Sequence, residues 1–147
     1  MTNYHLVILK KPYLDMILEG RKLIELRLYK KKHPAFGRVF VGDKLFLKVS
    51  SGPVYATATV EKIKTFENLT PGRIRDFKKQ YNHEIGGDNE HWQSKMDCKY
   101  CLLVWLKDIK VIEPVLIHKK DWRAWVVLTD KEDFGLLKNA AIRNLNK

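Results

Sequence analysis

The sequence has only two cysteines and no apolar run long enough to cross a bilayer. A membrane-spanning helix needs about 20 mostly apolar residues, so we expect no membrane partner. Residues 1–5 also lack the charged segment followed by an apolar one that marks a secretory signal. Two cysteines without such a signal are typical of a reducing compartment. We therefore expect an intracellular protein, cytoplasmic by default, with a nuclear location left open.

Signatures of common cofactor and nucleophile sites are missing as well. The chain has no phosphate-binding loop, no dinucleotide fingerprint and no convincing Ser, His and Asp order. Cys98 and Cys101 have a Cys-x-x-Cys spacing, but zinc would need two more ligands, and only His83 and His91 lie near. A redox pair normally opens a helix, whereas this pair runs into an apolar strand. We expect neither a metal nor a cofactor.

Acidic residues are few compared with basic ones. The chain has 17 Asp and Glu against 28 Lys and Arg, which gives a net charge of +11. Such a surface attracts polyanions, because neutralised phosphates release counterions. Many small proteins are basic without using that charge, but the four tryptophans and six tyrosines favour a nucleic-acid partner. No repeats or low-complexity segments appear, and 147 residues form one domain with a core of its own.

Hydrophobic periodicity and turn residues predict the secondary structure. Pro12 opens a helix that Gly20 ends, and Thr70 caps a helix with Pro71 at its first position. The predicted helices cover 12–19, 71–81, 89–95 and 130–147, and the predicted strands cover 4–10, 22–29, 43–49, 54–64, 100–105, 109–117 and 122–128. Five to seven short strands with three or four helices indicate an α+β fold built on a small barrel.

The segment that follows Gly20 contains charges of both signs among apolar residues. If it is a strand, alternate side chains share a face, so Glu25 and Arg27 point the same way. Partly buried charges are costly unless they are paired or used. Lys22, Glu25 and Arg27 therefore line a functional cleft or form salt bridges that hold this corner together.

These residues also carry a resemblance to a known family. Residues 9–13 read Leu-Lys-Lys-Pro-Tyr, residues 20–27 fit Gly-x-Lys-x-x-Glu-x-Arg, and residues 41–45 read Val-Gly-Asp-Lys-Leu. In this order they resemble the ASCH domain family of the PUA-like superfamily, most clearly over residues 5–62. The resemblance implies a single PUA-like β-barrel over 1–128, followed by a C-terminal helical tail over 129–147. The family is associated with RNA or modified-base recognition, and some small members hydrolyse N4-acetylcytidine or cleave RNA.

The resemblance makes Lys22 the candidate catalytic residue if the protein is an enzyme. In the small hydrolytic members the motif lysine acts in catalysis, which requires a lowered pKa. Glu25 departs from them, because they carry threonine there and a glutamate on the helix after the fourth strand. That glutamate would fall near Phe77, and no glutamate lies between Glu67 and Glu84. Glu25 matches the commoner family form, which is a binding signature.

Tryptophans beside cations are candidates for base stacking. Trp92 precedes Lys95, and Trp122 adjoins Arg123, whereas Trp105 and Trp125 lie among apolar residues and are assigned to the core. The predicted ligand-binding residues are Lys22, Glu25, Arg27, Trp92, Lys95, Trp122 and Arg123.

The predicted function is binding of RNA, single-stranded nucleic acid or a modified nucleoside in a basic cleft. Two alternatives stay open. The first is an enzyme, either a small hydrolase of N4-acylated cytidine or a metal-independent ribonuclease. The second is a protein–protein interaction module whose basic face is incidental. The sequence does not indicate an oligomeric state.

Overall fold

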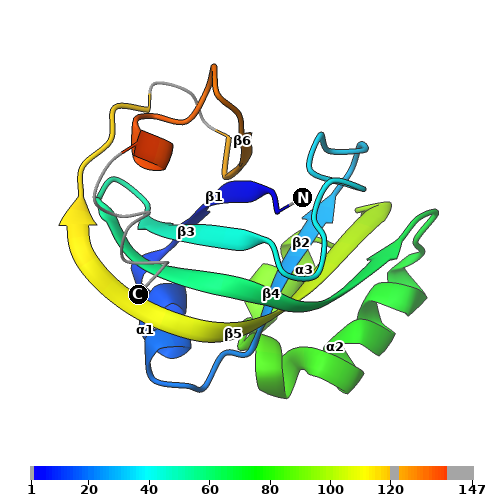
Figure 1. Ribbon diagram of the computed structural model, residues 1–147. Coiled ribbons are helices and arrows are strands. Elements are labelled where there is room, and N and C mark those ends of the chain that lie inside the picture. Colours follow the sequence, from blue (N-terminus) through cyan, green and yellow to red (C-terminus); the bar gives the residue numbers. More distant parts are fainter. Residues whose placement is uncertain (1, 120–122, 139–147) are drawn as a thin grey trace.

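The computed structural model describes residues 2–119 and 123–138, which form one curved sheet with helices around it (Figure 1). The sheet has six strands in the order β2-β5-β4-β3-β1-β6, and only the β1–β3 pair is parallel. The α+β prediction is therefore confirmed, and the half-barrel curvature is consistent with a PUA-like barrel. The elements are β1 (Tyr4–Leu9), α1 (Lys11–Leu18), β2 (Ile24–Tyr29), β3 (Lys44–Val49), β4 (Val54–Phe66), α2 (Pro71–Ile85), α3 (Asn89–Ser94), β5 (Tyr100–Val115), β6 (Trp125–Leu128) and a 3-10 turn at Leu136–Lys138.

Apolar residues fill three clusters around this sheet. The first lies inside the curve, where Val7 and Leu45 pack with α1 and with Trp125. The second joins β2 and β5 to α2 and α3. The third covers the outer face of β1, β3 and β6 and includes Leu6 and Leu136. Since Leu6 and Val7 are both fully buried, β1 is apolar on both faces, as its sequence predicts for a central strand.

Helix α2 begins and ends where its capping residues dictate. The Thr70 hydroxyl accepts a hydrogen bond from the Arg73 amide at 3.3 Å, and Pro71 occupies the first turn. The helix runs to Ile85, beyond the predicted end near Tyr81, because Tyr81 and Ile85 continue its buried stripe. Gly86 then ends it in the left-handed region, at φ +77°.

Strand β5 corrects the prediction of two separate strands over 100–105 and 109–117. It is continuous over 16 residues, with bulges in its pairing to β4 and a positive φ at Asp108. Pro114 does not break it, because β2 pairs only with Tyr100–Trp105 and leaves the far half of β5 with β4 alone. Proline is tolerated where a strand needs hydrogen bonds on one side only.

The predicted helix over 130–147 is wrong at the start of the segment. Residues 129–135 form turns, in which Thr129 and Asp133 accept backbone hydrogen bonds and Gly135 has φ +78°. Leu136 is fully buried against the outer face of the sheet. Residues 139–147 lie outside the described part of the chain. No helix among the described residues is long and apolar enough to cross a membrane.

A buried polar relay explains Asp43 of the Val-Gly-Asp sequence. The Trp125 indole N–H donates to Nδ1 of His5 at 3.1 Å, and Nε2 of His5 lies 2.9 Å from Asp43. Asp43 also accepts hydrogen bonds from the backbone amides of Asn3 and Phe40. Burial lowers the pKa of His5, so the ring is neutral and donates to Asp43. The relay joins β6, β1 and the turn before β3, so its role is structural.

Candidate functional site

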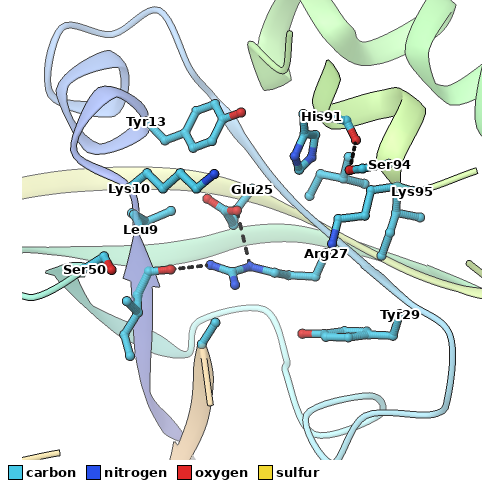
Figure 2. Close-up of a pocket in the computed structure, with 14 residues that line it drawn as sticks. Leu9, Lys10, Tyr13, Glu25, Arg27, Tyr29, Ser50, His91, Ser94 and Lys95 are labelled. Carbon is cyan, nitrogen blue, oxygen red and sulfur yellow. Dashed lines mark hydrogen bonds and ion pairs between the residues drawn. The ribbon is translucent and has the colours of Figure 1, made fainter. Parts of the chain in front are cut away.

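A cavity opens where the curved sheet brings β2 close to β1, two strands that do not pair with each other. Its volume is about 490 Å³, within the usual range for small-molecule sites. The ends of β1 and α3, the start of α1, the turn after β3 and one face of β2 form its walls (Figure 2). The polar side chains that line it are Lys10, Tyr13, Glu25, Arg27, Tyr29, Ser50, His91, Ser94 and Lys95.

Strand alternation places the charged face of β2 in this cavity. Ile24, Leu26 and Leu28 are buried in the cluster beneath α2. Glu25 and Arg27 therefore point the other way, as their spacing predicts, and line the cavity wall. Helix α2 thus fixes the orientation of the strand and the side chains that it presents.

Glu25 and Arg27 form the centre of the wall. The Arg27 Nε atom lies 3.3 Å from Oε1 of Glu25, and Nη2 donates to the Ile8 carbonyl at 2.9 Å. The guanidinium also lies 5.6 Å from the centroid of the Trp125 ring. Arg27 therefore bridges β2 to β1 across the opening of the half-barrel, in place of a strand ladder.

Lys22 lies behind this wall and does not line the cavity. Its ammonium donates to the carbonyls of Ile24 at 2.8 Å and Ile85 at 2.7 Å. The same nitrogen is 3.9 Å from Oε2 of Glu25 and 5.4 Å from the centroid of the Tyr13 ring. Burial lowers the pKa of Lys22, and Glu25 opposes that shift. The prediction that Lys22 lies in the cleft itself is therefore wrong: its ammonium supports β2, α2 and Glu25 from beneath.

Buried polar atoms without hydrogen-bond partners are concentrated on this wall. Among the described residues there are four such side-chain atoms, and three of them are Glu25 Oε2, Arg27 Nε and Tyr29 Oη. The fourth belongs to Thr57, which does not line the cavity. Burying a polar group without a hydrogen bond costs free energy. Arg27 Nε is ion-paired with Oε1 of Glu25 at 3.3 Å, so the two groups left for a ligand are Glu25 Oε2, with the Lys22 ammonium 3.9 Å away, and the Tyr29 hydroxyl.

Positive charge dominates the cavity. Lys10, Arg27 and Lys95 face one carboxylate, that of Glu25. Among the described residues, neither Lys10 nor Lys95 has a side-chain hydrogen bond or an ion pair. Burial lowers the pKa of His91, with help from Lys95, so its ring stays neutral at pH 7. The site can therefore bind an anion while offering one carboxylate to an N–H donor.

The burial of the tryptophans agrees with the predictions only in part. Trp92 is 1% exposed, and its indole N–H donates to Asn82 at 2.9 Å, so the stacking prediction for it is wrong. Trp125 is buried, as predicted. Trp105, assigned to the core, packs against the apolar cluster beneath α2 but is only partly buried, with Lys62 4.8 Å from its ring centroid.

The remaining predicted binding residues are Trp122 and Arg123, of which only Arg123 belongs to the described part of the chain. Trp122 falls outside the described residues. Arg123 is exposed, interacts with Glu132 and does not line the cavity, although its neighbour Ala124 does. Among the described residues, no group of three or more His, Cys, Asp or Glu side chains could hold a metal, and the thiols of Cys98 and Cys101 are buried and free.

Sequence reasoning missed six of the nine polar residues that line the cavity, namely Lys10, Tyr13, Tyr29, Ser50, His91 and Ser94. Tyr29 shares the parity of Glu25 and Arg27 on β2, so the alternation that found those two residues also predicts its position. Lys10 and Tyr13 belong to the Leu-Lys-Lys-Pro-Tyr segment, which served only to mark the family. No sequence pattern predicted that His91 lines the cavity, because its position depends on how α3 packs against α2.

Comparison with known proteins assigns the family. The family model of the ASCH domain matches residues 7–138, so the chain belongs to the ASCH domain family, which is linked to RNA binding. A serine-to-alanine variant of the ASCH protein of Zymomonas mobilis has a similar structure, with a TM-score of 0.69 at 14% identity, covering 91% of this chain and 94% of that one. Another structure of that ASCH protein gives 0.68 at 14% identity, covering 88% and 90%. At such identity the likeness shows the fold alone. No curated protein matched the sequence.

Proposed function

We propose that the protein binds RNA through an unpaired nucleotide that enters the cavity between β1 and β2. The observation that carries this proposal is the carboxylate of Glu25, which is 6% exposed and has one oxygen without a hydrogen-bond partner, beside Lys10, Arg27 and Lys95. A carboxylate accepts from a base amino or imino group, and cations attract phosphate. Tyr13 and His91 add aromatic surface to the same walls.

The position of Lys22 supports binding over lysine-based hydrolysis. A catalytic lysine must reach the reacting carbon with a free amine. The Lys22 nitrogen is instead held by two backbone carbonyls behind Glu25. The cavity also supports a ligand site over the alternative of a flat protein–protein surface.

Titration of a labelled single-stranded oligoribonucleotide at several salt concentrations tests the proposal. Log K should fall linearly with log salt concentration, because bound phosphates release counterions. Lys95→Gln should weaken binding and reduce the salt slope by about one, as expected for one lost phosphate contact. The matched control is Lys79→Gln, on the exposed side of α2.

Two results would contradict the proposal. One is the absence of binding to single-stranded RNA even at low salt. The other is a loss of affinity in Lys79→Gln with none in Lys95→Gln, which would move the interface to α2.

A further inference from the structure

The three polar side chains of β2 that line the cavity differ in chemistry and follow one another along it. Glu25 offers a carboxylate oxygen and Tyr29 offers a hydroxyl, and between them lies the Arg27 guanidinium, which is ion-paired with Glu25. Figure 2 shows the three side chains in this order down one wall. Alternate residues of a strand are about 6.6 Å apart along the backbone, so the Cα atoms of Glu25 and Tyr29 lie roughly 13 Å apart. A ligand that reaches both the Glu25 carboxylate and the Tyr29 hydroxyl must therefore be elongated and must carry different groups at its two ends.

The Glu25 end of the row suits a hydrogen-bond donor. An ionised carboxylate only accepts hydrogen bonds, and Oε1 already faces the Arg27 guanidinium at 3.3 Å. The free oxygen, Oε2, has the Lys22 ammonium 3.9 Å behind it. A phosphate placed here would meet the negative charge of Glu25, whereas the amino group of a base would meet an acceptor.

The Tyr29 end suits an anion. Burial raises the pKa of Tyr29 to about 12, so the hydroxyl keeps its proton and can donate. The Tyr29 ring is stacked on His33 with centroids 4.4 Å apart, which fixes the direction of the hydroxyl. Lys95 reaches from the end of α3 toward Arg27, so two cations lie beside this half of the row (Figure 2).

We propose that the cavity holds a nucleotide in one orientation, with the base amino group on Glu25 and the phosphate on Tyr29, Arg27 and Lys95. This inference rests on the proposed function and adds to it a ligand class, a nucleoside monophosphate unit, and a phosphate-binding role for Tyr29. The site would then distinguish a nucleotide from the corresponding nucleoside.

Calorimetric titration with cytidine, cytidine 5′-monophosphate, adenosine and adenosine 5′-monophosphate tests this orientation. The monophosphates should bind more tightly than the nucleosides. Tyr29→Phe keeps the ring stacked on His33 and removes only the hydroxyl, so it should weaken monophosphate binding about tenfold and leave nucleoside binding nearly unchanged. Glu25→Gln should weaken both. The matched control is Tyr100→Phe, because Tyr100 pairs with Tyr29 in the neighbouring strand but does not line the cavity.

The outcomes separate the inference from the proposed function. Equal effects of Tyr29→Phe on nucleosides and monophosphates, or no effect on either, would overturn the orientation. Binding of single-stranded RNA without binding of any of the four small probes would also overturn it, and would leave the proposed function standing. Absence of binding to the probes and to RNA alike would remove both.

Discussion

Lys22 shows how one buried charge can support a site without entering it. Its ammonium fixes the carbonyl of Ile24 at the start of β2 and that of Ile85 at the end of α2. It also places a positive charge 3.9 Å from Glu25, which helps to offset the cost of burying that carboxylate. Lys22 thus connects the end of α2, the start of β2 and the Glu25 side chain of the cavity wall.

Replacement of Lys22 tests this role. Lys22→Met fills similar space but leaves two buried carbonyls without a donor, so it should lower the free energy of unfolding by roughly 2–4 kcal/mol. The matched control is Lys31→Met, at an exposed position, where a change within about 0.5 kcal/mol is expected. Urea denaturation at pH 7 measures both. Equal stability of the two variants would mean that the carbonyls of Ile24 and Ile85 do not depend on Lys22.

Residues of the site were predictable where a local pattern fixes their direction. The alternation along β2 was enough to place Glu25 and Arg27 on one face. Trp92 was misplaced because its sequence neighbour Lys95 says nothing about the Asn82 side chain, on another helix, that binds the indole N–H. The burial of Lys22 likewise depends on Ile85, 63 residues further along the chain.

At the scale of elements, α2 positions the cavity wall from behind. Its buried stripe packs against β2, and its C-terminal end supplies the Ile85 carbonyl to Lys22. The next residue, Gly86, has a positive φ and faces Met16 of α1. The start of this helix was predictable from Thr70 and Pro71, since N-terminal capping is a local effect. The contact between Gly86 and Met16 was not, because it joins two helices far apart in the sequence.

Replacement by alanine should have opposite effects on stability at two glycines, Gly72 inside α2 and Gly86 at its C-terminal end. Gly72 lies in the first turn, and a Cβ there would meet only the Thr70 hydroxyl, at 3.8 Å. Gly72→Ala should therefore raise the free energy of unfolding by about 0.5–1 kcal/mol, because alanine restricts the unfolded chain. Gly86→Ala should lower it by roughly 1–2 kcal/mol, from the left-handed backbone alone.

Thermal or urea unfolding of both variants measures this difference. The contact with Met16 adds to the cost at Gly86, since a Cβ would lie 2.1 Å from its terminal methyl unless that flexible side chain moves. A Gly86→Ala protein as stable as Gly72→Ala would contradict the left-handed end of α2.

At the scale of the whole molecule, the sheet stays open between its edge strands, β2 and β6, and the cavity lies where β2 comes close to the end of β1. Closure of the barrel would pair β2 with β6, whereas here the Arg27 side chain connects β2 to the Ile8 carbonyl of β1. The sequence indicated an α+β barrel because strand and helix signals are local. It did not predict the parallel pairing of β1 with β3 or the position of β6, because these depend on contacts between distant segments.

The net charge of +11 makes nucleic acid a natural partner but does not say where it binds. The exposed side of α2 carries Arg73, Arg75 and Lys79, and the cavity carries Lys10 and Lys95. The unpartnered polar atoms favour the cavity, because a basic helix surface needs no ligand to be stable in water. The central claim is therefore that RNA binds at the cavity and not on the exposed side of α2.

Amide chemical-shift mapping during titration with single-stranded RNA tests that location most directly. We predict that the largest shifts fall on residues 8–10, 25–29 and 91–95, and that Glu25→Gln reduces them. Shifts confined to residues 71–80 of α2, with the amides of residues 25–29 unchanged, would contradict the account.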